Sequence, residues 1–233
     1  MRNFLTESLK KAEINFDDKV IDNFIKYNDL LITWNEKINL TAITEPFEVV
    51  TKHFIDSSVG EGLIKEEARV IDVGAGAGFP SLPLKIVRSD LEVLMLDSLN
   101  KRVNFLNEVI NELSLSGISA VHGRAEEYAK KERESFDVCV SRAVARLSVL
   151  CEYCLPYVKV GGVFLAYKGP QAEEEIVEAK RAIDILGGKV VDKKEYNLPD
   201  SDITHTIIVI KKVRQTPIKY PRNSGKIAKS PII

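Results

Sequence analysis

A glycine-rich loop directly after a short apolar segment restricts the fold of this chain more than any other feature. The segment 70–73 is apolar and β-branched apart from Asp72, and the loop behind it contains Gly74, Gly76 and Gly78. Glycine lets the backbone approach a ligand at positions where a Cβ atom would clash. In doubly wound sheets, ligands bind in the crevice at the carboxyl ends of the strands. The loop therefore predicts an α/β fold with a ligand site where this first strand ends.

Strand and helix patterns alternate from Ala68 onward, which predicts a parallel, doubly wound sheet. Strands are expected at 69–73, 91–96, 118–121, 136–140, 162–167, 189–196 and 204–211, and helices at 82–87, 101–115, 125–131, 147–158 and 173–186. The nearly continuous apolar strands are typical of a sheet that is covered on both faces. No helix separates the last two strands, so we expect them to pair antiparallel.

The regions before and after this pattern differ from it. Residues 1–60 are expected to form a helical extension, because apolar residues recur at helical spacing and no strand pattern interrupts them. Residues 61–213 are then the α/β domain, and residues 214–233 a basic C-terminal tail. Three prolines, Pro217, Pro221 and Pro231, predict that the tail is extended rather than helical.

Charge is distributed unevenly along the chain. Residues 211–233 carry seven lysines and arginines and no acidic residue, and because the whole chain has a formal net charge of −1, the rest carries −8. A basic end on an acidic body indicates a polyanionic partner, although a solvated tail without a partner would show the same composition.

The composition excludes several classes of protein. The chain has 233 residues, of which 45% are hydrophobic and 29% charged, as expected of a folded domain with a core. No apolar run approaches the roughly 20 residues of a membrane helix, and the N-terminus lacks the apolar core of a signal peptide. Three cysteines do not make a disulfide framework. We therefore expect a soluble, cytosolic protein without a membrane partner.

The spacing of the glycines in the loop limits which kinds of ligand it can bind. A dinucleotide fingerprint requires G-x-G-x-x-G, whereas Phe79 stands where the third glycine should be, and no Gly-Lys-Ser/Thr of a P-loop follows. Asp97, at the end of the second strand, can accept hydrogen bonds from both hydroxyls of a ribose. This combination suits a nucleoside with an amino-acid tail, such as S-adenosylmethionine, and a purely structural turn is the alternative.

At this point the chain resembles the class I S-adenosylmethionine-dependent methyltransferases, and more closely the bacterial ribosomal RNA small subunit methyltransferase G family, also called glucose-inhibited division protein B. The resemblance covers residues ~35–230 and is carried by Asn39-Leu40-Thr41-Ala42-Ile43, Lys52-His53-Phe54-Ile55-Asp56-Ser57, Asp72-Val73-Gly74-Ala75-Gly76-Ala77-Gly78-Phe79-Pro80, Leu96-Asp97-Ser98, Lys101-Arg102, Ser141-Arg142-Ala143-Val144-Ala145 and Tyr220-Pro221-Arg222. It implies a Rossmann-like, seven-stranded, mostly parallel sheet with an antiparallel last strand. It also implies methylation of N7 of guanine 527, in the 530 loop of 16S ribosomal RNA.

The resemblance also assigns site residues. It places Gly74 and Phe79 at the methionine end of the cofactor, Asp97 and Ser98 at the ribose, and Ala125 and Glu126 at the adenine. Gly76 and Gly78 belong to the same loop. Arg142 is expected to lie where the methyl group is delivered, both as a cofactor contact and as the catalytic residue.

The chemistry of guanine N7 is consistent with these residues. N7 carries a lone pair and no proton, so its methylation needs no general base. Arg142 follows the fourth strand, where exocyclic-amine methyltransferases commonly carry Asp/Asn-Pro-Pro-Tyr/Phe, and an arginine can hydrogen-bond guanine O6. Cys139 is interpreted as a core residue rather than a nucleophile. Cys151 and Cys154 lie in an apolar helical stretch and have no second ligand pair, so we expect no metal site.

The three histidines fall in no obvious acid–base pair. His53 and Asp56 are one helical turn apart, which indicates local pairing, although His53 could also face the cofactor cleft. His122 is interpreted as structural or as a neighbour of the site, and His205 as structural.

The expected partner is 16S ribosomal RNA or the small ribosomal subunit, and we expect the protein to be a monomer. Candidate phosphate contacts are Lys101, Arg102, Arg146, Lys168, Lys219 and Arg222. Three alternatives stay open: a methyltransferase of the same fold acting on a small molecule or protein, a nicotinamide-dependent dehydrogenase, and an inactive RNA-binding scaffold. Deleting residues 214–233 should abolish RNA methylation and leave cofactor binding intact.

Overall fold

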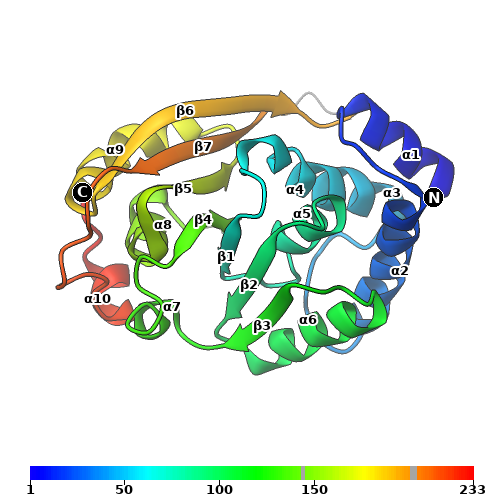
Figure 1. The fold of residues 1–233 in the computed structure, drawn as a ribbon, viewed down its shortest axis with the longest axis horizontal. Helices are drawn as coiled ribbons and strands as arrows, with labels where there is room; N and C mark the ends of the chain where they lie inside the picture. The colour runs from blue at the N-terminus through cyan, green and yellow to red at the C-terminus, as the bar shows by residue number, and fades with distance from the viewer. Residues whose placement is uncertain (143–144, 200–203) are drawn as a thin grey trace.

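A seven-stranded sheet forms the centre of the protein in a computed structural model that describes residues 1–142, 145–199 and 204–233 (Figure 1). The strand order is β3-β2-β1-β4-β5-β7-β6. The strands are β1 (Arg69–Val73), β2 (Glu92–Asp97), β3 (Ile118–His122), β4 (Phe136–Ser141), β5 (Val158–Lys168), β6 (Gly188–Asn197) and β7 (Thr204–Lys212). Ala143 and Val144, which belong to the motif after β4, lie outside the described residues.

The pairing of the strands confirms the expected topology. β1 pairs in parallel with both β2 and β4, β2 pairs in parallel with β3, and β4 with β5. β7 runs antiparallel to β5 and to β6. The order reverses at β1 and β4, so the loops after these two strands flank the crevice in which such sheets bind ligands.

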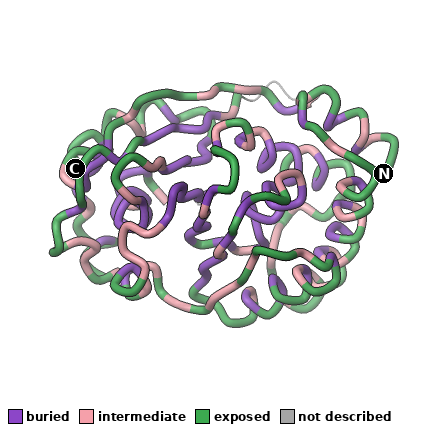
Figure 2. Tube along the Cα trace, viewed as in Figure 1, coloured by how far each residue is buried: buried purple, intermediate pink, exposed green. Residues whose placement is uncertain are grey.

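Two hydrophobic clusters cover the two faces of the sheet, because alternate residues of each strand point to opposite sides. Val70 and Ile207 belong to one cluster, and their neighbours Ile71 and Ile208 to the other. The first face is covered by α5 (Ser81–Val87), α6 (Asn100–Glu112) and the N-terminal helices. The second is covered by α8 (Leu147–Cys154) and α9 (Ala172–Ile185), with the short α7 (Ala125–Tyr128) at its margin. Figure 2 shows the buried residues running along the strands and the inner sides of the helices.

The N-terminal region is helical, as the sequence predicts. It contains α1 (Arg2–Lys11), α2 (Asp18–Asn35), α3 (Pro46–Val49), a π-helical turn η1 (Val50–Ile55) and α4 (Asp56–Ser58), followed by the 3₁₀ turn η2 (Glu61–Leu63). The Asp17 side chain accepts a hydrogen bond from the backbone N–H of Val20 at 2.8 Å and caps α2. Leu9, Phe24 and Phe54 are fully buried in the same cluster as Val70, so the extension packs directly against the α/β domain.

The C-terminal segment differs from the expected extended tail. The 3₁₀ turn η3 (Leu155–Tyr157) follows α8, and after β7 the chain returns to α8 and forms α10 (Ser224–Lys229) (Figure 1). The prediction was wrong for residues 224–229, because the prolines lie outside them. The Asn223 side chain caps the helix by accepting from the N–H of Lys226, and Ile227 is fully buried. Within the described residues, no helix is both long and apolar enough to span a membrane.

Candidate cofactor site

The glycine loop is held against the end of β2 by backbone hydrogen bonds. The N–H groups of Gly74 and Ala75 both donate to the carbonyl oxygen of Leu96, at 2.9 and 3.1 Å. Gly74 has a φ of +79°, in the left-handed region that glycine tolerates best, and a Cβ atom there would point into open space. At Gly78 a Cβ atom would overlap the side chain of Leu82. The loop therefore presents backbone, rather than side chains, to the crevice.

Asp97, the last residue of β2, holds the glycine loop through its side chain. Its carboxylate is almost fully buried and accepts the N–H of Gly76 at 2.9 Å and the N–H of Leu99 at 2.8 Å. Arg102 Nη1 lies 3.6 Å from Asp97 Oδ2. Each carboxylate oxygen has two acceptor positions, so both oxygens keep capacity for a further donor such as a hydroxyl. The structure thus brings together the two features from which the sequence predicts a nucleoside site.

A cavity of about 260 Å³ lies beside the loop, at the carboxyl ends of the first three strands. Four of its lining residues, Gly74, Ser98, Ala125 and Glu126, are among the predicted cofactor contacts. The full lining is Val73, Gly74, Leu96, Ser98, Gly123, Arg124, Ala125, Glu126, Ala145, Leu150, Tyr153 and Ser224. A larger hollow of about 460 Å³, near Asn15 and Lys85, contains none of the predicted residues.

The residues around the loop fit S-adenosylmethionine. The Asp72 carboxyl lies at the base of the loop, and its Oδ2 accepts the N–H of Ser81 at 3.3 Å, whereas Oδ1 is buried without a hydrogen-bond partner. Burial raises the pKa of Asp72 to about 7. A cationic neighbour would stabilise the ionised form, and the cofactor carries an ammonium group. The cavity, the exposed Gly74 and the Asp97 carboxylate complete a site for a nucleoside with a charged tail.

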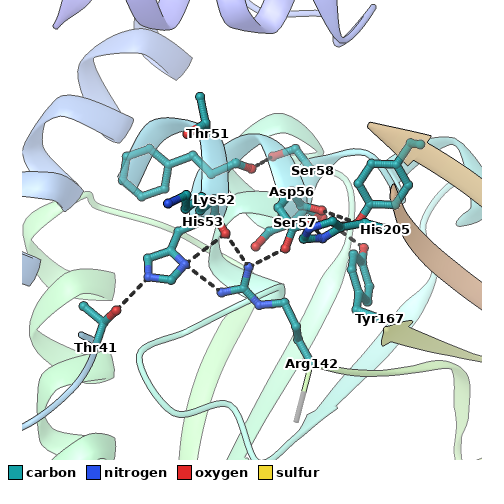
Figure 3. Close-up of polar contacts among 12 residues, drawn as sticks. Thr41, Thr51, Lys52, His53, Asp56, Ser57, Ser58, Arg142, Tyr167 and His205 are labelled. Atoms are coloured by element: carbon teal, nitrogen blue, oxygen red, sulfur yellow. Dashed lines mark hydrogen bonds and ion pairs between the residues drawn. The ribbon is translucent and has the colours of Figure 1, made fainter. Parts of the chain in front are cut away.

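Arg142 lies on the other side of the loop and makes several polar contacts (Figure 3). Its Nη1 donates to Asp56 Oδ2 at 2.6 Å and to the carbonyl oxygen of Lys52 at 3.0 Å, while Nη2 lies 3.1 Å from His53 Nδ1. The guanidinium carbon is 4.9 Å from the centre of the Phe79 ring. The turn η1 and α4 therefore fix the arginine beside the last residue of the glycine loop.

His53 makes polar contacts through both ring nitrogens. Its Nδ1 lies 3.1 Å from Arg142 Nη2 and 3.1 Å from the Lys52 carbonyl oxygen, and its Nε2 lies 2.8 Å from Thr41 Oγ1. Burial, followed by the charge of Arg142, lowers the pKa of His53 to about 4. The neutral ring also stacks on Phe79, with 4.4 Å between the ring centres. His53 thus contacts Arg142 rather than Asp56, and it links the N-terminal region to the loop after β4.

Asp56 collects contacts that the sequence analysis did not anticipate. Besides Arg142, it accepts from Tyr196 Oη at 2.8 Å and lies 2.9 Å from His205 Nδ1. Burial acts to raise the pKa of Asp56, but the hydrogen bonds from His205 and Tyr196 and the charge of Arg142 lower it below its usual value. These partners come from β6, β7 and the loop after β4. Because they lie far from Asp56 in the sequence, the spacing of residues around Asp56 could not have predicted them.

The predicted RNA contacts fall into two groups. Lys101, Arg146 and Lys219 are exposed, and Arg102 is partly exposed beside Asp97. Lys168 is buried, and its Nζ donates to the Ala145 carbonyl oxygen and pairs with Glu175, each at 2.7 Å. The Arg222 side chain forms an ion pair with the buried Glu152. The expectation that Lys168 and Arg222 contact phosphates does not agree with this placement, because internal carboxylates already neutralise both charges.

The cysteines are core residues. Cys139, Cys151 and Cys154 are free thiols and fully buried, and burial raises the pKa of Cys151 and Cys154 well above the usual value. Across the described ranges, no group of three or more histidine, cysteine and acidic side chains is arranged to hold a metal ion. His122 Nε2 lies 3.0 Å from the Ser98 carbonyl oxygen, next to the cavity. It is thus a neighbour of the site, as one of its two interpretations held.

Comparison with known proteins gives the same picture. A protein of Alkaliphilus metalliredigens called ribosomal RNA small subunit methyltransferase G is 53% identical, with 98% of this chain and 97% of that protein covered. A protein of the same name from Acetivibrio thermocellus is 54% identical, with 100% and 97% covered.

The solved structure of M. jannaschii TYW2 in complex with AdoMet has a TM-score of 0.55 at 15% identity and covers 68% of this chain and 76% of that chain, which shows a shared fold. The sequence profile of the family described as rRNA small subunit methyltransferase G matches residues 20–204. With this match and the identity to the curated relatives, the chain belongs to the rRNA small subunit methyltransferase G family.

Proposed function

We propose that this protein transfers a methyl group from S-adenosylmethionine to N7 of guanine 527, in the 530 loop of 16S ribosomal RNA. The observation that carries this proposal is the cavity beside the glycine loop, where Gly74, Ser98, Ala125 and Glu126 meet in a chain of this family. Asp97 and Asp72 supply the carboxylates that a nucleoside with a cationic tail requires.

Each part of the site has a distinct role in this mechanism. When bound, S-adenosylmethionine supplies an electrophilic methyl group on a sulfonium. Gly74 and Phe79 would line the methionine end, Asp97 and Ser98 would contact the ribose, and Ala125 and Glu126 would flank the adenine. Guanine N7 needs no general base, so the protein contributes mainly by holding the base in line with the methyl group.

Arg142 is the residue we assign to orienting the guanine. Its guanidinium is fixed by Asp56 and by the Lys52 carbonyl oxygen, so little side-chain entropy is lost when the base binds. Arginine can donate to O6 of guanine, on the same edge of the base as N7. This contact would hold N7 in line with the methyl group.

We assign RNA binding to exposed cations at this edge of the sheet. Lys101 and Arg146 follow β2 and β4, and Lys219 lies in the C-terminal segment. Contacts of this kind provide affinity that depends on salt rather than on sequence. The target guanine is expected to be unstacked, because duplex RNA hides N7 in a deep, narrow groove. The protein is proposed to act as a monomer in the bacterial cytoplasm.

The test is methylation of free 16S RNA and of 30S particles with labelled cofactor, followed by nucleoside analysis. Label in 7-methylguanosine at position 527 is the expected result. Label in another nucleoside would contradict the proposed base and atom. Calorimetric titration with S-adenosylhomocysteine and with NAD separates the enzyme class, because NAD binding without S-adenosylhomocysteine binding would indicate a dehydrogenase.

A further inference from the structure

The C-terminal segment is attached to the body of the protein by defined polar contacts. Arg133 donates to the carbonyl oxygens of Tyr220 at 2.8 Å and Pro217 at 3.1 Å. The N–H of Thr216 donates to Glu134 Oε1 at 2.8 Å. The segment therefore follows a fixed course from the end of β7 back to α8.

The strongest of these contacts joins Arg222 to Glu152 of α8. The backbone N–H and the Nε of Arg222 both donate to Glu152 Oε1 at 2.8 Å, and Nη2 donates to Oε2 at 2.6 Å. The side chain of Glu152 is 1% exposed. A bidentate, charge-assisted pair of this kind is both directional and costly to break, because removal of one partner leaves a buried charge.

The pair lies next to the cofactor cavity. Tyr153 follows Glu152 in α8 and lines the cavity, and Ser224, two residues after Arg222, lines it from the C-terminal segment. The fully buried Ile227 holds α10 against the body of the protein. Ser224 is therefore fixed by the Arg222–Glu152 pair before it and by Ile227 after it. Residues far apart in the chain, Gly74 and Ser224, thus border one cavity.

We infer that the C-terminal segment forms one wall of the cofactor pocket at Ser224 and that Arg222, through Glu152, is the positioning residue of this wall. The inference rests on the proposed function, because it takes the cavity to be the cofactor site. The sequence analysis expects cofactor binding to survive deletion of residues 214–233. If the inference holds, this deletion should weaken cofactor binding as well as RNA methylation. If the wall is in place in only a fraction of molecules, the apparent dissociation constant rises by the inverse of that fraction.

Hydrogen exchange of the full-length wild-type protein tests the wall directly. S-adenosylhomocysteine should slow exchange in peptides that cover residues 74–79 and also in those that cover 222–229. A purely structural tail would not respond to the ligand. Protection of the glycine loop with unchanged exchange at 222–229 would overturn the inference and leave the proposed function standing.

Calorimetric titration with S-adenosylhomocysteine tests the positioning residue. Arg222→Ala should raise the dissociation constant about tenfold, as expected if the wall is formed in about a tenth of the molecules. Lys229→Ala is the matched control, because it removes the same charge from an exposed position of α10 and should bind within about twofold of wild type. Circular dichroism and thermal unfolding verify that both variants are folded.

The two proposals fail in different ways. Arg222→Ala with wild-type affinity would overturn the role of Arg222, and so would an equal loss in Lys229→Ala. If the wild-type protein itself bound no S-adenosylhomocysteine, the proposed function would fail, and this inference with it. Ile227→Ala provides an independent variant, because it loosens α10 without altering the ion pair, and it should also weaken binding.

Discussion

Both ends of the chain pack against the α/β domain, but different forces hold them there. The N-terminal helices bury Leu9, Phe24 and Phe54 in the cluster that contains Phe79, so their attachment is largely apolar. The C-terminal segment is attached through Arg133 and Arg222, whose partners are backbone carbonyls and one buried carboxylate. Apolar burial is non-directional and adds to the core, whereas polar contacts fix a position and contribute little net stability.

This difference predicts that the N-terminal helices stabilise the whole fold, whereas the C-terminal segment mainly stabilises one wall of the pocket. Loss of an N-terminal contact should affect the whole fold, because it opens a cavity in the larger hydrophobic cluster. Loss of a C-terminal contact should affect one pocket wall, because the ends of a chain can detach locally while the sheet stays intact. The predictions below test this comparison in order of expected effect.

The largest effect is expected from Phe54→Ala. Phe54 is fully buried and stacks between Phe24 and Tyr27, with ring-centre distances of 4.8 and 5.3 Å. Its truncation should lower the free energy of unfolding by about 3–5 kcal/mol, measured by urea denaturation. Ile227→Ala should cost less, because α10 can open locally. Equal losses in the free energy of unfolding would show that both ends are integral to the fold and would refute the predicted difference between them.

Arg142→Ala should separate catalysis from cofactor binding. Loss of the positioned donor should lower kcat about a hundredfold, the scale observed for preorganised donors in active sites. Affinity for S-adenosylhomocysteine should change much less. Arg181→Ala is the control, because this arginine is exposed on α9 and does not line the cavity. A variant that loses affinity with an unchanged kcat would instead assign Arg142 to the cofactor alone.

Asp97→Ala tests the part of the site that neither end of the chain supplies. The substitution removes the acceptor for Gly76 N–H and the proposed acceptor for the ribose, so affinity for S-adenosylhomocysteine should fall by about 1–3 kcal/mol. Titration calorimetry measures this affinity, and Asp192→Ala, at an exposed position of β6, is the control. An affinity within twofold of wild type would remove Asp97 from the ribose site.

The smallest expected effect concerns pH. His53 has a pKa of about 4 in the folded protein and an ordinary value of 6.5, so between these values the unfolded state binds more protons than the folded state. Stability is therefore fully present above pH 6.5 and is lost as the pH falls toward 4, with a loss of about 1 kcal/mol by pH 5.5.

Urea denaturation at pH 7 and at pH 5.5 measures this loss. In His53→Gln the difference between the two pH values should shrink, whereas His122→Gln should keep it because that ring is exposed. A pH dependence that is the same in His53→Gln as in wild type would show that protonation of His53 does not cause this loss.

Local sequence patterns were enough to predict the sheet and the glycine loop. Apolar runs and their alternation with helical spacing gave all seven strands within a few residues, because strand and helix periods are properties of consecutive residues. The absence of a helix before Thr204 correctly predicted the antiparallel pairing of β6 and β7. The pairing of the loop with Asp97 was also predictable, because the carboxyl ends of adjacent parallel strands meet at one edge.

Contacts between distant segments were decided by the tertiary structure alone. The sequence shows a basic tail, but only the fold shows that Arg222 meets the buried Glu152 and that Lys168 meets Glu175. Asp56 likewise draws its partners from three other segments. The physical reason is that charge and spacing are local properties of a sequence, whereas the partner and the desolvation of each charge depend on which segments the packed core brings together.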